Sequence, residues 1–252
     1  MRFVRYQVGN DEPCYGWCYE DLVGPIDGSP FGDYRRMEAQ FPLASVRLMA
    51  PVQPSKIVCI GRNYIDHAKE QGADVPEIPM LFMKPPSALI GHRDTIILPP
   101  QSSKVEHEAE LAVVIGKSGR WIQPEQAGEH IFGYTIANDV TARDLQRKDG
   151  QWTRGKGFDT FCPVGPWIET ELDPYDILIS SRVNDEIRQM ASTRDMVFSI
   201  QQLIAFISSV MTLQPGDLIL TGTPAGVGPL EDGDQVSIHI EGIGDLINLV
   251  KK

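Results

Sequence analysis

The sequence lacks several features that would assign it to a specialised class of protein. It has four cysteines, and the pair with ligand-like spacing, Cys14 and Cys18, has no second Cys or His pair to complete a zinc site. We therefore expect reduced thiols in a cytoplasmic protein. No apolar signal segment is visible at the N-terminus, and the most apolar long stretch, residues 196–213, is interrupted by Ser and Gln residues. Neither secretion nor a membrane span is predicted.

Positive charge is also scarce. The chain has 23 Lys and Arg residues against 34 Asp and Glu residues, so its formal net charge is −11. Nucleic acids and anionic membranes are not expected as partners, since both bind basic surfaces. An anionic small substrate would need local positive charge, supplied by a metal ion or by a few placed Lys and Arg side chains. At 252 residues and 42% hydrophobic composition the chain can bury a full core.

Paired carboxylates mark the centre of the chain. Residues 111–115 are apolar and mostly β-branched, which predicts a strand that ends at Gly116. Since side chains two residues apart share one face of a strand, Glu108 and Glu110 should project side by side, with Glu106 beyond them. Unpaired buried carboxylates are costly. Either this strand end is solvated, or a divalent cation with oxygen ligands lies between the carboxylates.

The remaining segments predict a mixed α+β fold that is mainly β. Residues 1–50 form a small β-rich leader with short strand-like runs, and the prolines at positions 51 and 54 mark a boundary before a larger domain, residues 51–252. One long helix is expected after Ser199, because Ser199 and Gln202 form a capping-box pattern and apolar residues follow at helical spacing. Further strands are expected at residues 56–60, 81–86, 131–138, 177–184, 218–221 and 235–240.

A short helix is predicted within residues 62–72, with Asn63 capping its start and Gly72 ending it. His67 and Glu70 are three residues apart and so lie on the same side of this helix. The pair is either an incidental surface contact or part of a lid, because so short a helix is stable only when docked. Lys84 stands where an apolar strand ends, as a functional or as a surface lysine.

Charged residues recur at two further junctions. Residues 139–146 look helical, which would align Asp139, Arg143 and Gln146 on one face, while the alternative role for Asp139 is a helix N-cap. Lys156 lies between two glycines, which would let the backbone approach a ligand closely. The glycine-rich loop at residues 222–229 either donates backbone N–H groups to a carboxylate or is a plain turn.

Together these motifs resemble the fumarylacetoacetate hydrolase family, over roughly residues 51–245. The motifs occur in the family's order: Gly61-Arg62-Asn63-Tyr64 with His67 and Glu70, Lys84-Pro85, Glu108-x-Glu110, Asp139-x-x-x-Arg143, Gly155-Lys156-Gly157-Phe158-Asp159 and Thr221-Gly222-Thr223-Pro224-x-Gly226-Val227-Gly228. The short leader is similar to that of compact members such as acylpyruvases and oxaloacetate decarboxylases. The resemblance implies a β-sandwich roll with a few short helices and a small N-terminal β-rich domain, and a homodimer.

The resemblance also implies a site. One Mg²⁺ or Mn²⁺ ion per chain would be held by Glu108, Glu110 and Asp139, since all-oxygen ligands suit these ions better than Zn²⁺. Lys156 would add positive charge beside the substrate, and His67, oriented by Glu70, would act as a base. The implied substrate-binding residues are Arg62, Tyr64, Lys84, Arg143, Gln146, Thr221 and Thr223.

The implied activity is metal-dependent chemistry on small anionic 2-oxo acids, including 2,4-diketo acids, through a metal-bound enolate. The expected reaction is C–C bond hydrolysis of acylpyruvates or decarboxylation of oxaloacetate. The alternative is a decarboxylase or isomerase of the 2-hydroxy-hepta-2,4-diene-1,7-dioate type. An alternative hypothesis from a different functional class is a non-catalytic metal-binding module. In such a module Lys156 and the His67–Glu70 pair would have no role.

Overall fold

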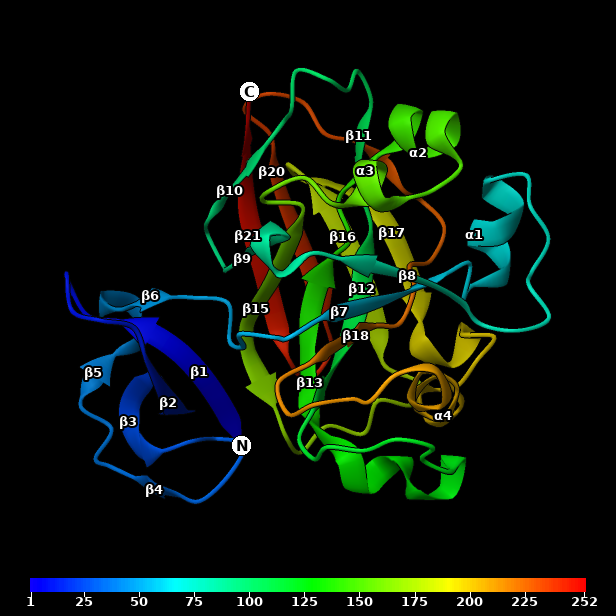
Figure 1. Ribbon diagram of the computed structural model, residues 1–252. Coiled ribbons are helices and arrows are strands. Elements are labelled where there is room, and N and C mark those ends of the chain that lie inside the picture. The colour runs from blue at the N-terminus through cyan, green and yellow to red at the C-terminus, as the bar shows by residue number, and fades with distance from the viewer.

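The computed structural model describes all 252 residues and is built around one large sheet that the N-terminal leader joins (Figure 1). The strands of the leader lie at the lower left of Figure 1, and β1 pairs with β15 of the main body through Arg2–Glu169 and Phe3–Ile168. The division into two domains stays a prediction. The sheet comprises β1 (Arg2–Gln7), β2 (Cys14–Tyr19), β3 (Leu22–Gly28), β4 (Tyr34–Arg36), β5 (Phe41–Pro42), β6 (Arg47–Leu48), β7 (Ile57–Gly61), β8 (Met80–Lys84), β9 (Leu89–Ile90), β12 (Ala109–Ile115), β13 (Ile131–Asn138), β15 (Cys162–Glu169) and β18 (Leu218–Leu220).

Two smaller sheets complete the roll. A five-stranded sheet has the order β10 (Thr95–Ile97), β21 (Gly244–Lys251), β20 (Gln235–Ile240), β16 (Leu178–Val183) and β17 (Glu186–Ser192). A three-stranded sheet contains β14 (Thr141–Ala142), β11 (Val105–His107) and β19 (Gly228–Pro229). The predicted fold class, mixed α+β and mainly β with a roll, is confirmed.

Strand β12 is buried on both faces, which makes it the centre of the fold. Leu111 and Val113 pack in the main core with residues of the five-stranded sheet, while Ala112 and Val114 pack in a second core with β7 and β18. Because strand side chains alternate, Glu108 and Glu110 lie on the same side as Ala112 and Val114. The carboxylates therefore sit at the end of a fully buried strand face.

The helices are short and lie at the edges of the roll (Figure 1). The α-helices are α1 (Ile65–Glu70), α2 (Arg143–Asp149), α3 (Thr153–Lys156) and α4 (Ile200–Val210), and the 3₁₀ helices are η1 (Leu43–Ser45), η2 (Pro86–Ala88), η3 (Pro124–His130) and η4 (Thr193–Asp195). Ser199 and Gln202 form the predicted capping box at α4. None of the helices combines the length and apolarity that a membrane span requires.

Two local predictions are wrong. Residues 139–146 are not one helix: Asp139 follows β13, β14 intervenes, and α2 begins only at Arg143, so Asp139 neither shares a helix face with Arg143 nor caps the helix. Asn63 does not cap α1, whose N-cap residue is Tyr64. Instead, the Asn63 side-chain amide donates to the carbonyls of Thr221 and Phe198 and accepts from the Phe198 N–H. In both segments long-range pairing outweighs the local helical pattern.

Candidate active site

Three carboxylates meet at the end of the central strands. Glu110 lies on β12, Glu108 in the gap between β11 and β12, and Asp139 directly after β13. The antiparallel register pairs Ala109 with Asn138, which brings the two strand ends together. One oxygen of each carboxylate lies within 4.8 Å of the others, and all three residues are buried. The three residues that the resemblance implies as metal ligands thus lie together, and their role as ligands stays a prediction.

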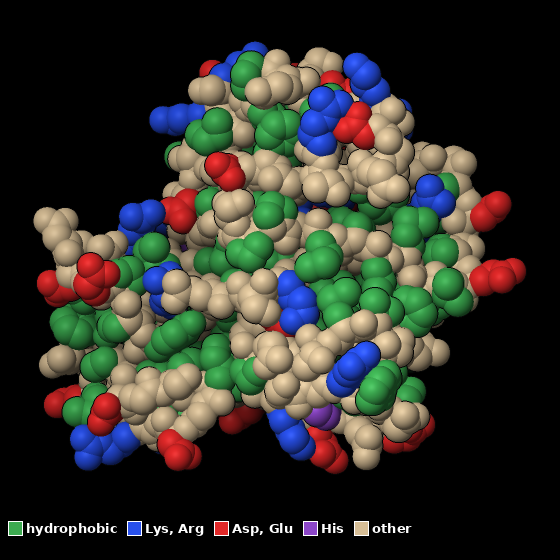
Figure 2. Space-filling view, in the orientation of Figure 1, with side chains coloured by type: hydrophobic (Ala, Val, Ile, Leu, Met, Phe, Trp, Pro, Cys, Tyr) green, Lys and Arg blue, Asp and Glu red, His purple; other side chains and the backbone are tan.

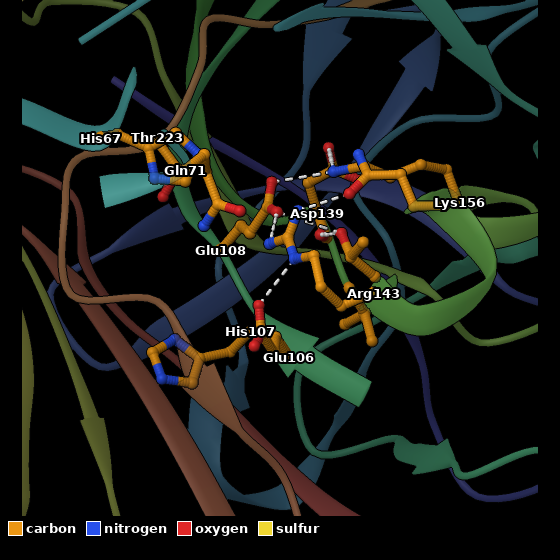
Figure 3. A network of polar contacts seen from close by, with 12 residues as sticks. His67, Gln71, Glu106, His107, Glu108, Asp139, Arg143, Lys156 and Thr223 are labelled. Atoms are coloured by element: carbon orange, nitrogen blue, oxygen red, sulfur yellow. Dashed lines mark hydrogen bonds and ion pairs between the residues drawn. The ribbon is translucent and has the colours of Figure 1, made fainter. Parts of the chain in front are cut away.

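Two buried lysines neutralise part of this charge. The Lys84 ammonium donates to Asp139 Oδ1 at 2.6 Å and to the Val140 carbonyl at 3.0 Å. The Lys156 ammonium donates to Asp139 Oδ2 at 2.6 Å and to Glu108 Oε2 at 2.8 Å (Figure 3). Burial alone would lower the pKa of Lys156, but the Asp139 and Glu108 carboxylates outweigh it and raise the pKa. Lys156 is therefore a charged group facing the carboxylates.

Two helices hold Lys156 in place. Lys156 is the last residue of α3, and a Cβ at Gly155 would lie 2.9 Å from the backbone of Gln146 in α2. A Cβ at Gly157 would lie 2.6 Å from the Thr153 carbonyl oxygen. The flanking glycines are thus required by close packing of the protein's own backbone around Lys156, and the predicted close approach to a ligand stays a prediction.

Arg143 links the Glu106 and Glu108 carboxylates. Its guanidinium donates to Glu106 Oε2 at 2.6 Å, to Glu108 Oε1, and to the Gln146 side-chain oxygen at 2.6 Å (Figure 3). Burial would raise the pKa of Glu108, but the charges of Lys156 and Arg143 hold it well below its usual range. The role of Glu106 as a partner of Arg143 could not be read from the sequence, because 37 residues separate them.

Glu110 is left without a side-chain cation in contact. One oxygen accepts the Gly222 backbone N–H at 2.6 Å. Burial, followed by the nearby charges of Asp139 and Glu108, raises the pKa of Glu110 well above its ordinary value. Glu106, Glu108 and Asp139 each pair with Lys or Arg side chains, Glu106 also with Lys104 at 3.1 Å, so Glu110 alone of these four buried carboxylates lacks a cationic partner. A divalent ion at this all-oxygen set would supply the missing positive charge, so the residues fit Mg²⁺ or Mn²⁺.

A candidate base faces the same cavity. His67 Nδ1 lies 3.1 Å from Glu70 Oε2, and the other Glu70 oxygen accepts the Gly226 N–H at 3.0 Å. The Glu70 carboxylate thus favours the tautomer in which Nδ1 carries the proton and Nε2 is free to accept one. The glycine-rich loop donates N–H groups to two carboxylates, as the sequence allows, but both belong to the protein.

The cavity has a volume of about 250 Å³ and brings most predicted site residues together. Its polar lining includes the predicted residues Arg62, His67, Glu108, Glu110, Arg143, Gln146, Lys156 and Thr223. The sequence did not single out Gln71, Phe82, Arg147 and Trp152, which also line it. Trp152 could have been suspected, since it precedes the Gly-Lys-Gly motif.

Other predicted residues lie behind the cavity wall. Asp139 and Lys84 are fully buried. Lys84 donates to Asp139, and Asp139 also accepts from Lys156, which lines the cavity. The Thr221 hydroxyl donates to the Leu111 carbonyl at 2.8 Å, which joins β18 to β12. The Tyr64 side chain is buried, and its hydroxyl has no hydrogen-bond partner.

The comparisons with known proteins agree with this geometry. Residues 56–251 match the family described as fumarylacetoacetate (FAA) hydrolase, C-terminal, and residues 1–51 match a family described as Rv2993c-like, N-terminal. An uncharacterised protein of Methanocaldococcus jannaschii is 56% identical over 200 residues, which cover 79% of this chain and 84% of that protein. The mitochondrial oxaloacetate tautomerase FAHD2A of Homo sapiens is 47% identical over 232 residues, with coverages of 86% and 74%.

A solved structure is also closely similar. The 2-hydroxyhepta-2,4-diene-1,7-dioate isomerase from Mycobacterium marinum is 47% identical, with a TM-score of 0.92 over 100% of this chain and 98% of that one. The family match covers well over half of the chain and includes every residue of the carboxylate and lysine cluster. The chain belongs to the fumarylacetoacetate hydrolase family.

Proposed function

We propose that the protein is a divalent-cation-dependent enzyme that interconverts the keto and enol forms of small 2-oxo dicarboxylates such as oxaloacetate. The observation that carries this proposal is the common cavity of about 250 Å³, which a base, His67, shares with Lys156, Glu108 and Glu110. Proton transfer next to a 2-oxo group needs this combination of a base and positive charge. The names of the human and mycobacterial relatives, a tautomerase and an isomerase, agree with this chemistry.

The chain's own residues supply the proton transfer. His67 takes a proton from C3 of the substrate at Nε2 while Glu70 holds the Nδ1 proton and stabilises the imidazolium. The Lys156 ammonium offsets negative charge that develops on the 2-oxo oxygen, and His67 returns the proton to that oxygen or to C3. A Mg²⁺ or Mn²⁺ ion bound by Glu108, Glu110 and Asp139 would supply Lewis-acid polarisation of the 2-oxo group.

Two arginines favour a substrate with a second carboxylate. Arg62 and Arg147 both line the cavity and make no ion pair with an acidic residue of the protein. Arg147 only donates to the Gln71 side-chain oxygen, at 3.3 Å. Arg143, in contrast, is already occupied by Glu106 and Glu108. Arg62 and Arg147 are thus available to bind the distal carboxylate of a dicarboxylic acid, which a bidentate guanidinium does well.

Hydrolysis of acylpyruvates remains the second candidate. The His67–Glu70 pair could equally take a proton from water, which would then attack the acyl carbon. Decarboxylation of oxaloacetate, the other reaction expected from the family resemblance, needs no base to activate water. The three reactions therefore differ in how much they depend on His67.

The variant His67→Ala separates these reactions. Purified protein with Mg²⁺ is assayed for exchange of the oxaloacetate C3 protons in D₂O by NMR, for acetylpyruvate cleavage, and for CO₂ release. We expect the wild type to exchange C3 protons fastest, and His67→Ala to lower that rate by about 10²–10⁴, the usual contribution of a general base. CO₂ release should fall much less.

A matched control is His239→Ala, because His239 is exposed and pairs only with Asp245 on the surface. It should leave all three rates unchanged. Cleavage of acetylpyruvate faster than proton exchange would favour the hydrolase. Absence of all three activities in the wild type with Mg²⁺ would favour a non-catalytic cation-binding module and would contradict the proposal.

A further inference from the structure

Gln189 is a buried polar residue outside all the motifs that the sequence analysis singled out. It lies on β17, is 1% exposed, and contacts the glycine-rich loop that carries Thr223. Its amide nitrogen donates to Thr223 Oγ1 at 2.7 Å and to the Pro224 carbonyl at 2.8 Å. The loop lies directly on the strand here, because a Cβ at Gly226 would be 2.0 Å from the Arg188 carbonyl oxygen.

The orientation of the Gln189 amide is fixed by its backbone partners. Its oxygen accepts the Ala109 N–H at 3.0 Å, and a backbone N–H can only donate. Its nitrogen faces the Pro224 carbonyl, which can only accept. A flipped amide would place two donors together at one end and two acceptors at the other. The nitrogen must therefore be the atom that faces Thr223.

Other contacts strengthen this arrangement. The Ser181 hydroxyl donates to the same Gln189 oxygen at 3.0 Å, and His107 Nδ1 lies 3.2 Å from it. Hydrogen bonds accepted by an amide oxygen polarise the amide and make its N–H groups better donors. All of these partners are buried. Gln189 is therefore held in one orientation by β12 and β16 before any ligand arrives.

The consequence concerns the hydroxyl proton of Thr223. Since Gln189 donates to Thr223 Oγ1, the hydroxyl hydrogen cannot point back at Gln189. Thr223 donates to no acceptor of the protein, and it lines the cavity beside His67 and Gln71 (Figure 3). Its proton is thus available to an acceptor inside the cavity.

We infer that Gln189 is a positioning residue that fixes the Thr223 hydroxyl as a hydrogen-bond donor to a carboxylate of the substrate. This inference rests on the proposed function for the nature of the substrate, a small 2-oxo acid. It predicts that reversing the polarity of the residue at position 189 turns the Thr223 hydroxyl away. A carboxylate at that position accepts the proton of Thr223, which then presents lone pairs to the anionic substrate.

The test is a double-mutant cycle between Gln189→Glu and Thr223→Val. The readouts are the Kd of oxalate, a small dicarboxylate probe, measured by calorimetry with Mg²⁺, and the KM and kcat for oxaloacetate proton exchange. Each single variant should weaken oxalate binding by roughly ten- to hundredfold, the worth of a hydrogen bond to a charged group. KM should rise by a similar factor while kcat changes by less than about threefold. In the Thr223→Val background, Gln189→Glu should change Kd by less than about twofold.

Two further variants keep the result interpretable. Gln189→Met keeps the size of the side chain but has neither the N–H donors of glutamine nor the charge of glutamate. It replaces Gln189→Glu in the cycle if the latter does not fold. Thr135→Val is the matched control, because Thr135 is equally buried but its hydroxyl has no partner and it lies on β13, outside the cavity lining. It should leave Kd unchanged.

The outcomes are distinct. If the effects of Gln189→Glu and Thr223→Val on the Kd of oxalate multiply in the double variant, the inference is wrong. Unchanged oxalate binding by folded Gln189→Glu would also overturn it. Oxalate binding without oxaloacetate turnover in the wild type would contradict the proposed function instead. The cycle on Kd would then still decide the role of Gln189.

Discussion

Glu110→Gln should have opposite effects on the cation-free protein and on its response to cations. Glu110 is the carboxylate of the cluster that no side-chain cation contacts, and burial together with Asp139 and Glu108 raises its pKa. Without a cation, glutamine requires neither a buried charge nor proton uptake on folding, so the variant should be more stable than the wild type at neutral pH. With Mg²⁺ or Mn²⁺, the same change removes an anionic ligand and should weaken binding sharply.

The pH dependence follows from the raised pKa. Between the ordinary value of 4.5 and the raised value, Glu110 keeps its proton in the folded state but loses it in the unfolded state. The folded state then binds more protons, so its contribution to stability falls as pH rises, by up to about 1.4 kcal/mol per pH unit. For a chain of 252 residues this corresponds to about 3–6 °C in Tm per pH unit. Glutamine does not titrate, so the variant lacks this slope.

The assay is calorimetric unfolding of wild type, Glu110→Gln and the exposed control Glu129→Gln in EDTA, from pH 4.5 upwards, and again with excess Mg²⁺. The difference in Tm between Glu110→Gln and wild type isolates the single group, because other titrations cancel. A cation at 100 times its Kd adds about 2.7 kcal/mol, or roughly 5–11 °C, to the wild type. The variant should show little of this increase.

Two results would refute the reasoning. Parallel pH profiles for wild type and Glu110→Gln would mean that Glu110 does not carry the raised pKa. An undiminished rise of Tm with Mg²⁺ in the variant would mean that the three carboxylates do not hold the ion. The Glu129→Gln control should follow the wild type in both experiments, since Glu129 is exposed and its ion pair is with the exposed Lys117.

EDTA-treated protein should be inactive on oxaloacetate, and Mg²⁺ or Mn²⁺ should restore it; full activity in metal-free protein would contradict the assigned site. Residues 62–78 should exchange amide hydrogens faster than β12 and gain protection when oxalate and Mg²⁺ are added, because a short docked helix opens easily; equal protection in both states would argue against a lid. Asn63→Ala removes three hydrogen bonds of a buried side chain and should lower Tm by about 6–12 °C. A loss below 2 °C would show that water replaces them. The expected homodimer is checked by analytical ultracentrifugation, where a single monomeric species would exclude it.

Features with a short-range cause could be predicted from the sequence. The alternation of strand side chains placed Glu108 and Glu110 on one face, and the i, i+3 spacing placed His67 beside Glu70. The capping box at Ser199 formed as expected. In each case the geometry depends on residues at most three positions apart, so the pattern in the sequence determines it.

Features that depend on distant strands could not be predicted. The helix expected from Asp139 onward is interrupted by β14, because Thr141 and Ala142 pair with β11. Asn63 forms hydrogen bonds with residues more than 130 positions away instead of capping its own helix. The Gln189–Thr223 contact spans 34 residues and two elements. Such partners are set by the topology of the roll, which local propensities do not encode.

The distribution of charge on the surface does not point to a particular partner. On the face shown in Figure 2, basic side chains are scattered among acidic ones and do not gather in one patch. The prediction that no nucleic acid binds stays a prediction. The homodimer and the cytoplasmic location likewise stay predictions.

The site residues come from two kinds of element, strands of the main sheet and a peripheral helix. The carboxylates and Lys84 project from strands or strand ends of the main sheet, whereas His67, Glu70 and Gln71 lie on or directly after α1, at the right edge of Figure 1. Core strands tolerate few changes, while a peripheral helix and its loop can accept substitutions and insertions at small cost in stability. Substitutions in residues 65–78 can therefore alter the candidate base and one side of the cavity without rebuilding the charge cluster.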